Sequence, residues 1–142
     1  MMNLSYKTYG DMTENEYQLR YAVFVVEQKM AYEEEFENDE ENFSHCHIYN
    51  GKELVACARL GQVTNGAIRI GRISVRKDLR GSGIGKKIVE YAENVGYKSG
   101  YNKFFLIAQS YAKGFYEKLG YITEGKEFIE AGITHIKMTK IL

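Results

Sequence analysis

The 142-residue sequence contains no proline and only two cysteines. Cys46 and Cys57 each lie in an apolar, strand-like stretch without a CxxC spacing. We therefore expect both to be reduced core residues and not disulfide partners or metal ligands. No proline, Gly/Ser-rich linker or repeat marks a domain boundary, so we predict one domain over residues 1–142, large enough to fold around its own core.

The sequence also lacks net charge and long apolar runs. Its formal charge is zero at pH 7, which argues against nonspecific binding to nucleic acid or to an anionic membrane. No stretch of roughly 18 apolar residues could span a bilayer, and the N-terminus has no signal-like segment, so we expect a cytoplasmic protein. Charge is nevertheless uneven, because residues 33–41 are strongly acidic. This run is either a solvated loop or an acidic rim that attracts a cationic ligand.

Hydrophobic periodicity predicts a mixed α/β sheet. A strand is expected at 4–9, followed by a helix that begins at the Thr13–Glu16 capping box and continues to about Gln28. Its expected inward face comprises Tyr17, Tyr21, Phe24 and Gln28. Strands 45–49 and 53–60 flank Asn50-Gly51, which favours a tight hairpin. Further strands are expected at 67–75, 104–108, 121–123 and 133–139, and further helices after residue 84 and at 111–119. Strand 67–75, the helix after it and strand 104–108 predict a right-handed parallel crossover.

A glycine-rich turn, Arg80-Gly81-Ser82-Gly83-Ile84-Gly85, connects that strand to that helix. Such a turn can hold a diphosphate, because glycines allow close approach and the first N–H groups of a helix are unpaired. A Walker A loop would need one more residue and a hydroxyl at Lys87, and a dinucleotide fingerprint would need glycine at Lys86. The turn therefore fits neither ATP nor NAD. Alternatively, its glycines only shape a tight turn.

The residues Arg80-x-x-Gly83-x-Gly85 resemble the central motif, (Gln/Arg)-x-x-Gly-x-(Gly/Ala), of the GNAT superfamily of acyl-CoA-dependent N-acyltransferases. The segment from Phe115 to Tyr121 resembles the second landmark of that family, Phe-Tyr-x-Lys-x-Gly-(Phe/Tyr). Residues 23–28 and 132–138 are similar to the ElaA-like branch. The resemblance implies a mostly antiparallel sheet with one parallel strand-helix-strand crossover and flanking helices, and acetyl-CoA as the cosubstrate.

The resemblance also implies roles for particular residues. Backbone groups of Ile73, Ser74 and Val75 would meet the pantetheine arm, and an amide there would polarise the thioester carbonyl. The pyrophosphate would lie against the turn, whose residues are Arg80, Gly81, Ser82, Gly83, Ile84, Gly85 and Lys86. Tyr116 would protonate the departing thiolate after direct attack by the amine; alternatively it packs beside Phe115 as a structural residue.

The sequence offers two candidates for the general base. Glu27, near the end of the first helix, is one candidate, with a surface role as the alternative. His135 is another, because imidazole titrates near neutral pH, although a histidine satisfied within its strand would serve no chemistry. His45 and His47 share one face of a strand, but no third ligand is evident and we predict no metal. Arg59 and Arg72 lie in apolar strands, so each needs a carboxylate such as Glu27 or an acidic group of the acceptor.

We therefore predict an N-acetyltransferase that moves an acetyl or short acyl group to a primary amine of a small-molecule or protein acceptor. The resemblance leaves a homodimer open. One alternative is a noncatalytic CoA-binding or sensory module. The presence of Tyr116, the expected proton donor, argues against it. Another is an interaction domain in which the glycine turn is purely structural.

Overall fold

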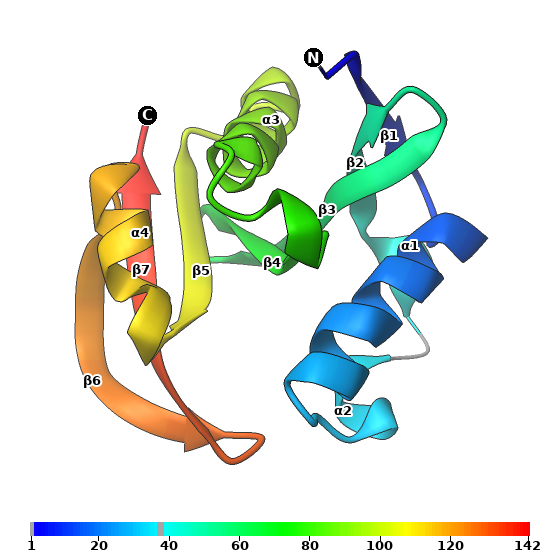
Figure 1. Cartoon of the computed structure of the whole chain (residues 1–142). Coiled ribbons are helices and arrows are strands. Elements are labelled where there is room, and N and C mark those ends of the chain that lie inside the picture. Colours follow the sequence, from blue (N-terminus) through cyan, green and yellow to red (C-terminus); the bar gives the residue numbers. More distant parts are fainter. Residues whose placement is uncertain (1, 37–38) are drawn as a thin grey trace.

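The computed structural model describes residues 2–36 and 39–142, which form a seven-stranded sheet flanked by helices (Figure 1). The sheet order is β1-β2-β3-β4-β5-β7-β6, with β4 and β5 parallel and the other neighbours antiparallel. The strands are β1 (Leu4–Tyr9), β2 (Ser44–Asn50), β3 (Glu53–Thr64), β4 (Ala67–Val75), β5 (Lys103–Gln109), β6 (Ile122–Glu130) and β7 (Ile133–Ile141). The predicted mixed sheet with one parallel crossover is confirmed.

The helices are α-helical, π-helical or 3-10. The α-helices are α1 (Glu14–Arg20), α2 (Tyr32–Glu35), α3 (Ile84–Lys98) and α4 (Lys113–Lys118). The π-helix η1 covers Tyr21–Glu27, and the 3-10 turns are η2 (Glu40–Asn42), η3 (Lys77–Leu79) and η4 (Ser110–Ala112). No helix of the described residues is long and apolar enough to cross a membrane.

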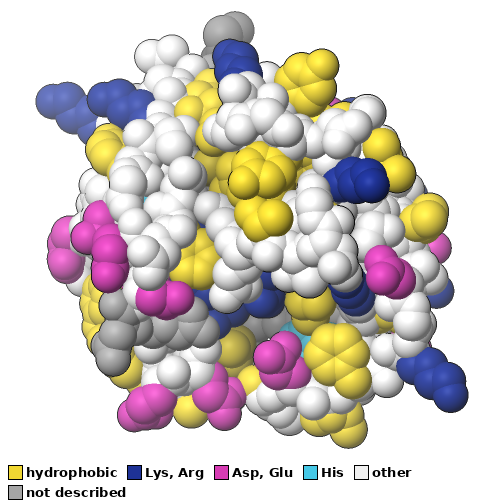
Figure 2. Space-filling view, turned by 180° about the vertical axis from the view of Figure 1, so that it is seen from behind, with side chains coloured by type: hydrophobic (Ala, Val, Ile, Leu, Met, Phe, Trp, Pro, Cys, Tyr) yellow, Lys and Arg dark blue, Asp and Glu magenta, His cyan; other side chains and the backbone are white. Residues whose placement is uncertain are grey.

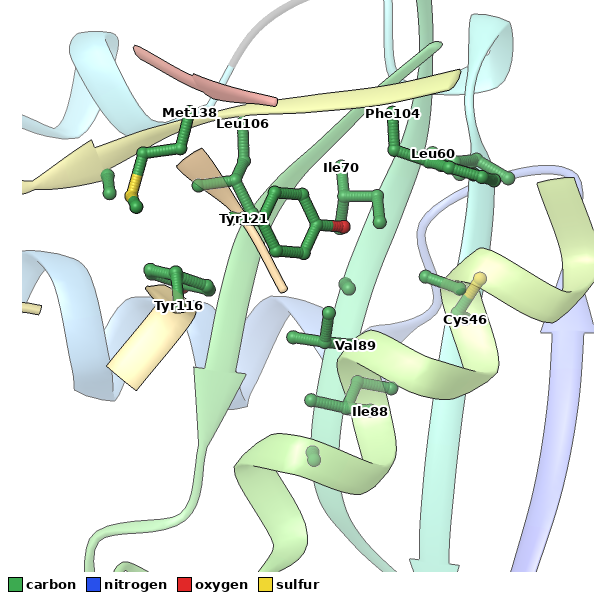
Figure 3. Close-up of a cluster of buried hydrophobic side chains, with 14 of the residues drawn as sticks. Cys46, Leu60, Ile70, Ile88, Val89, Phe104, Leu106, Tyr116, Tyr121 and Met138 are labelled. Atoms are coloured by element: carbon green, nitrogen blue, oxygen red, sulfur yellow. The ribbon is translucent and has the colours of Figure 1, made fainter. Parts of the chain in front are cut away.

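Successive side chains of β3 belong to two different hydrophobic clusters. Ala56 and Ala58 join the larger cluster, in which Ile88 and Val89 of α3 face Ile70 (Figure 3). The side chain between them, Cys57, belongs to a second cluster with residues of α1 and η1. Because successive side chains of a strand point to opposite faces, α3 and the α1–η1 pair cover opposite faces of the sheet.

Several local predictions are confirmed. The predicted hairpin of β2 and β3 is present, and Gly51 has a φ of +61° as a tight hairpin turn requires. Its two turn residues are Gly51 and Lys52 and not the predicted Asn50 and Gly51, because Asn50 is the last residue of β2 and pairs with Glu53. The predicted helix after residue 84 is α3, which begins at Ile84. Cys46 and Cys57 are free thiols with no exposed surface. By contrast, β6 was predicted too short, because it extends to Glu130, well beyond the three residues predicted. The prediction missed the rest of the strand because all of its side chains are exposed and show no apolar alternation.

The predicted inward face of the first helix is confirmed for Phe24, which is buried, and wrong for Tyr21, which is 38% exposed. The helix divides into α1 and η1, and its buried side chains also include Glu16, Leu19 and Arg20. Hydrophobic periodicity assigns charged residues to solvent, but here two charged side chains are paired inside the protein. Tyr17 and Tyr21 instead pack in an aromatic group with Tyr32.

The acidic run of residues 33–41 is not simply a solvated loop. Glu35 and Glu40 are buried, at 0% and 5% exposure. Arg20 donates hydrogen bonds to both, from Nε to Glu35 Oε1 at 2.6 Å and from Nη1 to Glu40 Oε1 at 3.0 Å. Glu33 and Glu34 are exposed, while Glu37 and Asn38 lie outside the described residues.

Candidate active site

The parallel strands β4 and β5 separate soon after they meet. Their paired residues are Ile68 with Phe104 and Arg69 with Phe105, although β4 continues to Val75 and β5 to Gln109. Figure 1 shows the two strands diverging beyond that contact. The described sheet is therefore open in its middle, at the carboxyl ends of its parallel pair, where ligands bind in many α/β sheets.

A bulge in β4 contributes to this opening. Cys57 pairs with Ser74 and Arg59 with Gly71, so β4 has one residue more than β3 between these pairs. Arg72 lies in the extra segment with a φ of +49°, a conformation that is strained for a residue with a side chain. Bulges re-aim the groups that follow them and are frequent beside active sites. The bulge precedes Ile73, in the stretch predicted to polarise a carbonyl.

A cavity of about 500 Å³ lies where β4 and β5 separate. Its walls come from β3, β4, β5, the end of η1, α4 and the β6–β7 turn, and include Arg59, Arg69, Ile73, Tyr116 and His135. Figure 2 shows Lys or Arg side chains and a His side chain inside a hollow near the middle of one face. This volume is in the range of pockets that hold small-molecule ligands.

The glycine turn stands at the start of α3. Gly83 is the N-cap residue of α3 with a φ of +89°, and Gly81 has a φ of +81°, so both positions favour glycine. A Cβ on Gly83 would meet no atom within 4 Å, so the surface there is open to a ligand. The first N–H groups of this 15-residue helix have no intrahelical partner. Exposed Lys86 adds positive charge beside them, so the turn fits a bound diphosphate.

Tyr116 of α4 occupies both the core and the cavity wall. It belongs to the larger apolar cluster with Tyr121 and Met138 (Figure 3), and it also lines the cavity. Burial raises the pKa of its hydroxyl above the usual value of 10, so the group remains protonated at neutral pH. The two interpretations made from the sequence are thus compatible, because the residue both packs in the core and lines the cavity.

His135 of β7 is held in one tautomer. Its Nδ1 lies 2.7 Å from the carbonyl oxygen of Ile133, and a carbonyl only accepts, so Nδ1 carries the proton. The other ring nitrogen, Nε2, is then an acceptor when the imidazole is neutral. Phe128 stacks on the ring at 6.0 Å between centroids. Since His135 lines the cavity, this arrangement suits a base that receives a proton there.

Comparison with known proteins identifies the family. Residues 9–142 match the family described as "Acetyltransferase (GNAT) domain". This chain belongs to the GNAT acetyltransferases.

The relatives of this GNAT chain include members of the ElaA-like branch. It is 34% identical to protein ElaA of Escherichia coli over 87% of this chain and 83% of ElaA. The crystal structure of ElaA has a TM-score of 0.82, with 27% identity and 99% coverage of both chains. An uncharacterized N-acetyltransferase, YjcF of Bacillus subtilis, is 37% identical over 86% of this chain and 87% of YjcF. An acyl-CoA N-acyltransferase from Pseudomonas aeruginosa has a TM-score of 0.84 at 28% identity, with 99% of both chains covered.

Glu27 lies differently from the other candidate bases of this GNAT chain. Its carboxylate is paired with Arg80 of the glycine turn, with Oε2 2.7 Å from Nη1 and Oε1 2.8 Å from Nη2. Arg80 also donates to the carbonyl of Val75. The hydrogen bonds from Arg80 lower the pKa of Glu27, which makes it a weaker base, and Glu27 is not among the residues that line the cavity. Its observed contact is structural, joining η1 to the turn.

A buried ionic cluster lies behind one wall of the cavity. Glu16 accepts hydrogen bonds from Arg20 Nη1 at 2.8 Å and lies 2.7 Å from both His45 Nδ1 and His47 Nε2. Three potential metal ligands of the described residues, Glu16, Glu40 and His45, lie within 4.8 Å of one another. The guanidinium of Arg20 already bridges Glu16 and Glu40, so an arginine supplies the positive charge that two buried carboxylates require. The two histidines are partners of Glu16.

The arginines of the apolar strands find other carboxylates than Glu27. Arg59 Nη1 lies 3.1 Å from Glu40 Oε2, and Arg72 Nε lies 3.0 Å from Glu35 Oε2. Sequence reasoning did not select Arg69, Gly71 or the bulge at Arg72 for the site. An available signal was the isolated glycine inside an apolar strand, which often marks a bulge or a close approach.

Proposed function

We propose that this chain transfers an acetyl or short acyl group from acyl-CoA to a primary amine by direct attack in a ternary complex. The observation that carries the proposal is the cavity between β4 and β5, which has Tyr116 and His135 on its walls. In the chain, β4 is followed by the short 3-10 turn η3 and then by the glycine turn. Family membership supports acyl transfer in general, and the arrangement of these groups supports this particular use of them.

The residues that we propose for CoA follow from the turn. Backbone N–H groups at the start of α3, from Gly81 to Lys86, would hold the pyrophosphate, where the helix dipole favours negative charge. Backbone groups from Ile73 to Val75 would meet the pantetheine arm. The charge of Arg80 is already paired with Glu27, so we assign Arg80 the role of fixing the turn, with Lys86 supplying the nearby net charge.

The chemical step needs a neutral amine, a polarised carbonyl and a protonated leaving group. His135 Nε2 would accept the proton that the attacking nitrogen loses, because the contact of Nδ1 with Ile133 leaves Nε2 as the acceptor. A backbone N–H after the bulge at Arg72 would stabilise the oxyanion. As the C–S bond breaks, Tyr116 would give its proton to the thiolate sulfur. The scheme uses no metal ion.

Thermal unfolding with acetyl-CoA, and with ATP and NAD as controls, tests the cosubstrate. A ligand at about 100 times its Kd adds about 2.7 kcal/mol, a rise in Tm of several degrees. A rise with acetyl-CoA alone supports the proposal, and no rise at saturation contradicts it. Thiol release with a panel of amines then tests turnover. Release with no amine, despite binding, would favour the noncatalytic CoA-binding module.

Two variants test the chemical roles. Tyr116→Phe should lower kcat by about 100-fold, as loss of an acid catalyst does, and should retain the stabilisation by acetyl-CoA. Tyr97→Phe is the matched control, because Tyr97 is 60% exposed on α3 and does not line the cavity. His135→Gln should also lower kcat. Unchanged turnover in Tyr116→Phe would remove the hydroxyl from the mechanism.

A further inference from the structure

The groups that we propose for the reaction stand on two sides of the opening between β4 and β5. The backbone groups of Ile73 to Val75 belong to β4. On the other side, His135 of β7 is paired with Gln109 of β5, and Tyr116 lies on α4, which follows β5 in the chain. Direct attack requires a fixed separation between the two sides, since a misplacement of about 1 Å can cost about 100-fold in rate.

Backbone hydrogen bonds between β4 and β5 do not fix this separation. Within the described sheet the two strands pair at Ile68 with Phe104 and at Arg69 with Phe105, near the start of each strand. Beyond that contact they diverge (Figure 1). The distance between their carboxyl ends must therefore depend on other contacts.

A chain of side-chain contacts joins the two strand ends through the end of η1. At β4, Arg80 donates to the carbonyl oxygen of Val75 from Nε at 3.2 Å and from Nη2 at 3.0 Å. The same guanidinium contacts both carboxylate oxygens of Glu27, at 2.7 and 2.8 Å. At β5, Gln109 Nε2 donates to Gln28 Oε1 at 2.7 Å. Because Glu27 and Gln28 are neighbours in the chain, the contacts run from the end of β4 to the end of β5. We call the side chains of Arg80, Glu27, Gln28 and Gln109 the strap.

The backbone at the end of η1 is unusual where it places the strap. The N–H of Gln28 donates to the carbonyl oxygen of Val23 at 3.2 Å, as in a π-helix, and Lys29 has a φ of +61°. Both features are uncommon, and both occur preferentially at functional sites. Gln28 and Gln109 are half-buried and line the cavity. The unusual backbone thus places an amide contact in the cavity wall.

Resting on the proposed function, we infer that Gln28 and Gln109 are positioning residues of the acyl transfer. Their amide contact, together with the Glu27–Arg80 pair, holds the reacting groups of the two sides at the separation that direct attack requires. Because Arg80 belongs to the turn proposed for the pyrophosphate, the strap also connects the cosubstrate site to the cavity. A contact that only stabilised the fold would have no such effect on the chemical step.

Gln109→Met tests the amide contact, because it keeps most of the side-chain volume and removes the amide. We expect kcat to fall by about 10- to 100-fold as alignment is lost. The KM for acetyl-CoA should stay within about twofold, since the glycine turn is unchanged. Gln18→Met is the matched control, because Gln18 donates to Glu14 at 2.9 Å on the exposed surface of α1, and it should leave kcat unchanged. Unchanged kcat in folded Gln109→Met would overturn the inference.

A double-variant cycle distinguishes one shared contact from two independent effects. Gln28→Met should lower kcat about as much as Gln109→Met does. Combining the two changes should add no more than about a twofold loss, because both remove the same hydrogen bond. Losses that multiply in the double variant would contradict the strap. So would a lower Tm with unchanged kcat in each variant, which is the result expected of a contact that only stabilises the fold.

The other half of the strap is tested at Glu27, which the sequence also offered as a base. Glu27→Gln keeps an oxygen that can accept a hydrogen bond from Arg80, whereas Glu27→Ala keeps none. We therefore expect kcat of Glu27→Gln to exceed that of Glu27→Ala by about fivefold. Equal losses in the two variants would indicate a base and would contradict a positioning role.

A distance measurement separates failure of this inference from failure of the proposed function. Nitroxide labels at Glu90→Cys and Lys118→Cys would report on the two sides, because both positions are exposed, α3 packs against β4, and α4 packs against β5. The native cysteines are completely buried. Electron–electron resonance on the free protein should show a broader or shifted distance distribution in Gln109→Met and not in Gln18→Met.

The two failures then have different signatures. If no amine is acylated but the distance distribution changes in Gln109→Met, the proposed function fails and the strap stands as the contact that sets the opening. If amines are acylated and the distribution does not change, the proposed function stands and the strap is refuted.

Discussion

Arg20 offers the sharpest test of how this fold tolerates buried charge. The side chain is completely buried and contacts three carboxylates, those of Glu16, Glu35 and Glu40, at 2.6–3.0 Å. Arg20→Met keeps much of the apolar volume and removes the cation. Each carboxylate then retains its other partners: the two histidines for Glu16, Arg59 and His45 for Glu40, and Arg72 for Glu35.

The expected loss is large. Removing one partner of a buried ionic group costs about 3–5 kcal/mol. For 142 residues the entropy of unfolding is about 0.3 kcal/mol per degree, so Tm should fall by about 10–17 °C. The measurement is calorimetric or circular-dichroism melting at pH 8. Arg76→Met, which breaks exposed ion pairs, is the control and should change Tm by no more than about 2 °C.

The deficit should also depend on pH. Burial already raises the pKa of Glu35 against the opposing charges of Arg20 and Arg72, and loss of Arg20 raises the folded-state values of the cluster further. A folded state that binds protons more readily than the unfolded chain gains stability as pH falls. The difference in Tm between wild type and Arg20→Met should therefore shrink from pH 8 to pH 5. A loss below about 3 °C at pH 8, or one that grows on acidification, would refute this account.

Three further predictions follow from burial and backbone geometry. Burial lowers the pKa of His45, but contacts with Glu16 and Glu40 raise it more, so that it lies above 6.5; its stabilisation is complete below pH 6.5 and is lost as pH rises through the folded value. His45→Gln should thus flatten the decline of Tm as the pH rises above 6.5. In Gly96→Ala the Cβ would lie 2.6 Å from buried Phe104, so the free energy of unfolding measured with denaturant should fall by about 1–3 kcal/mol. The control is Gly114→Ala, whose Cβ would meet no atom within 4 Å, and this change should be neutral or stabilising. Gly83→Ala and Gly100→Ala both place a side chain at positive φ in open space, so both variants should lose similar stability, about 1 kcal/mol. Only Gly83→Ala should weaken the binding of acetyl-CoA in titration calorimetry. Equal affinities of the two variants would argue against the turn as the pyrophosphate site.

Local pattern was enough to predict the elements whose side chains alternate or recur. The β2–β3 hairpin, α3 and β5 were predicted because their apolar residues repeat with a period of two or of 3.6, or form a short continuous run. The strand β6 was predicted short because a fully exposed strand has no such pattern. The family motifs located the glycine turn and Tyr116, since both depend on short-range spacing.

Longer-range features could not be predicted in this way. Glu16 and Arg20 count as outward residues in any helical pattern, and their burial depends on Glu35, Glu40 and His45, which come from later segments of the chain. The bulge at Arg72 depends on the register between β3 and β4. The sequence made Glu27 a candidate base of the site. Its pairing with Arg80, which is 53 positions away, becomes apparent only when η1 and the glycine turn are placed together.

The position of β7 has a consequence for biosynthesis. In the chain β7 follows β6, but in the sheet it lies between β5 and β6, and the sheet order gives β6 no other neighbour. As the chain leaves the ribosome, β6 must wait without a hydrogen-bonding partner until β7 has emerged, with exposed Ile122 and Ile129 along it. Damage to β7 would release two strands at once, together with His135. The wall of the cavity that carries this histidine is therefore completed late in folding, and nascent chains stalled before β7 would present an unpaired strand edge to chaperones and to one another.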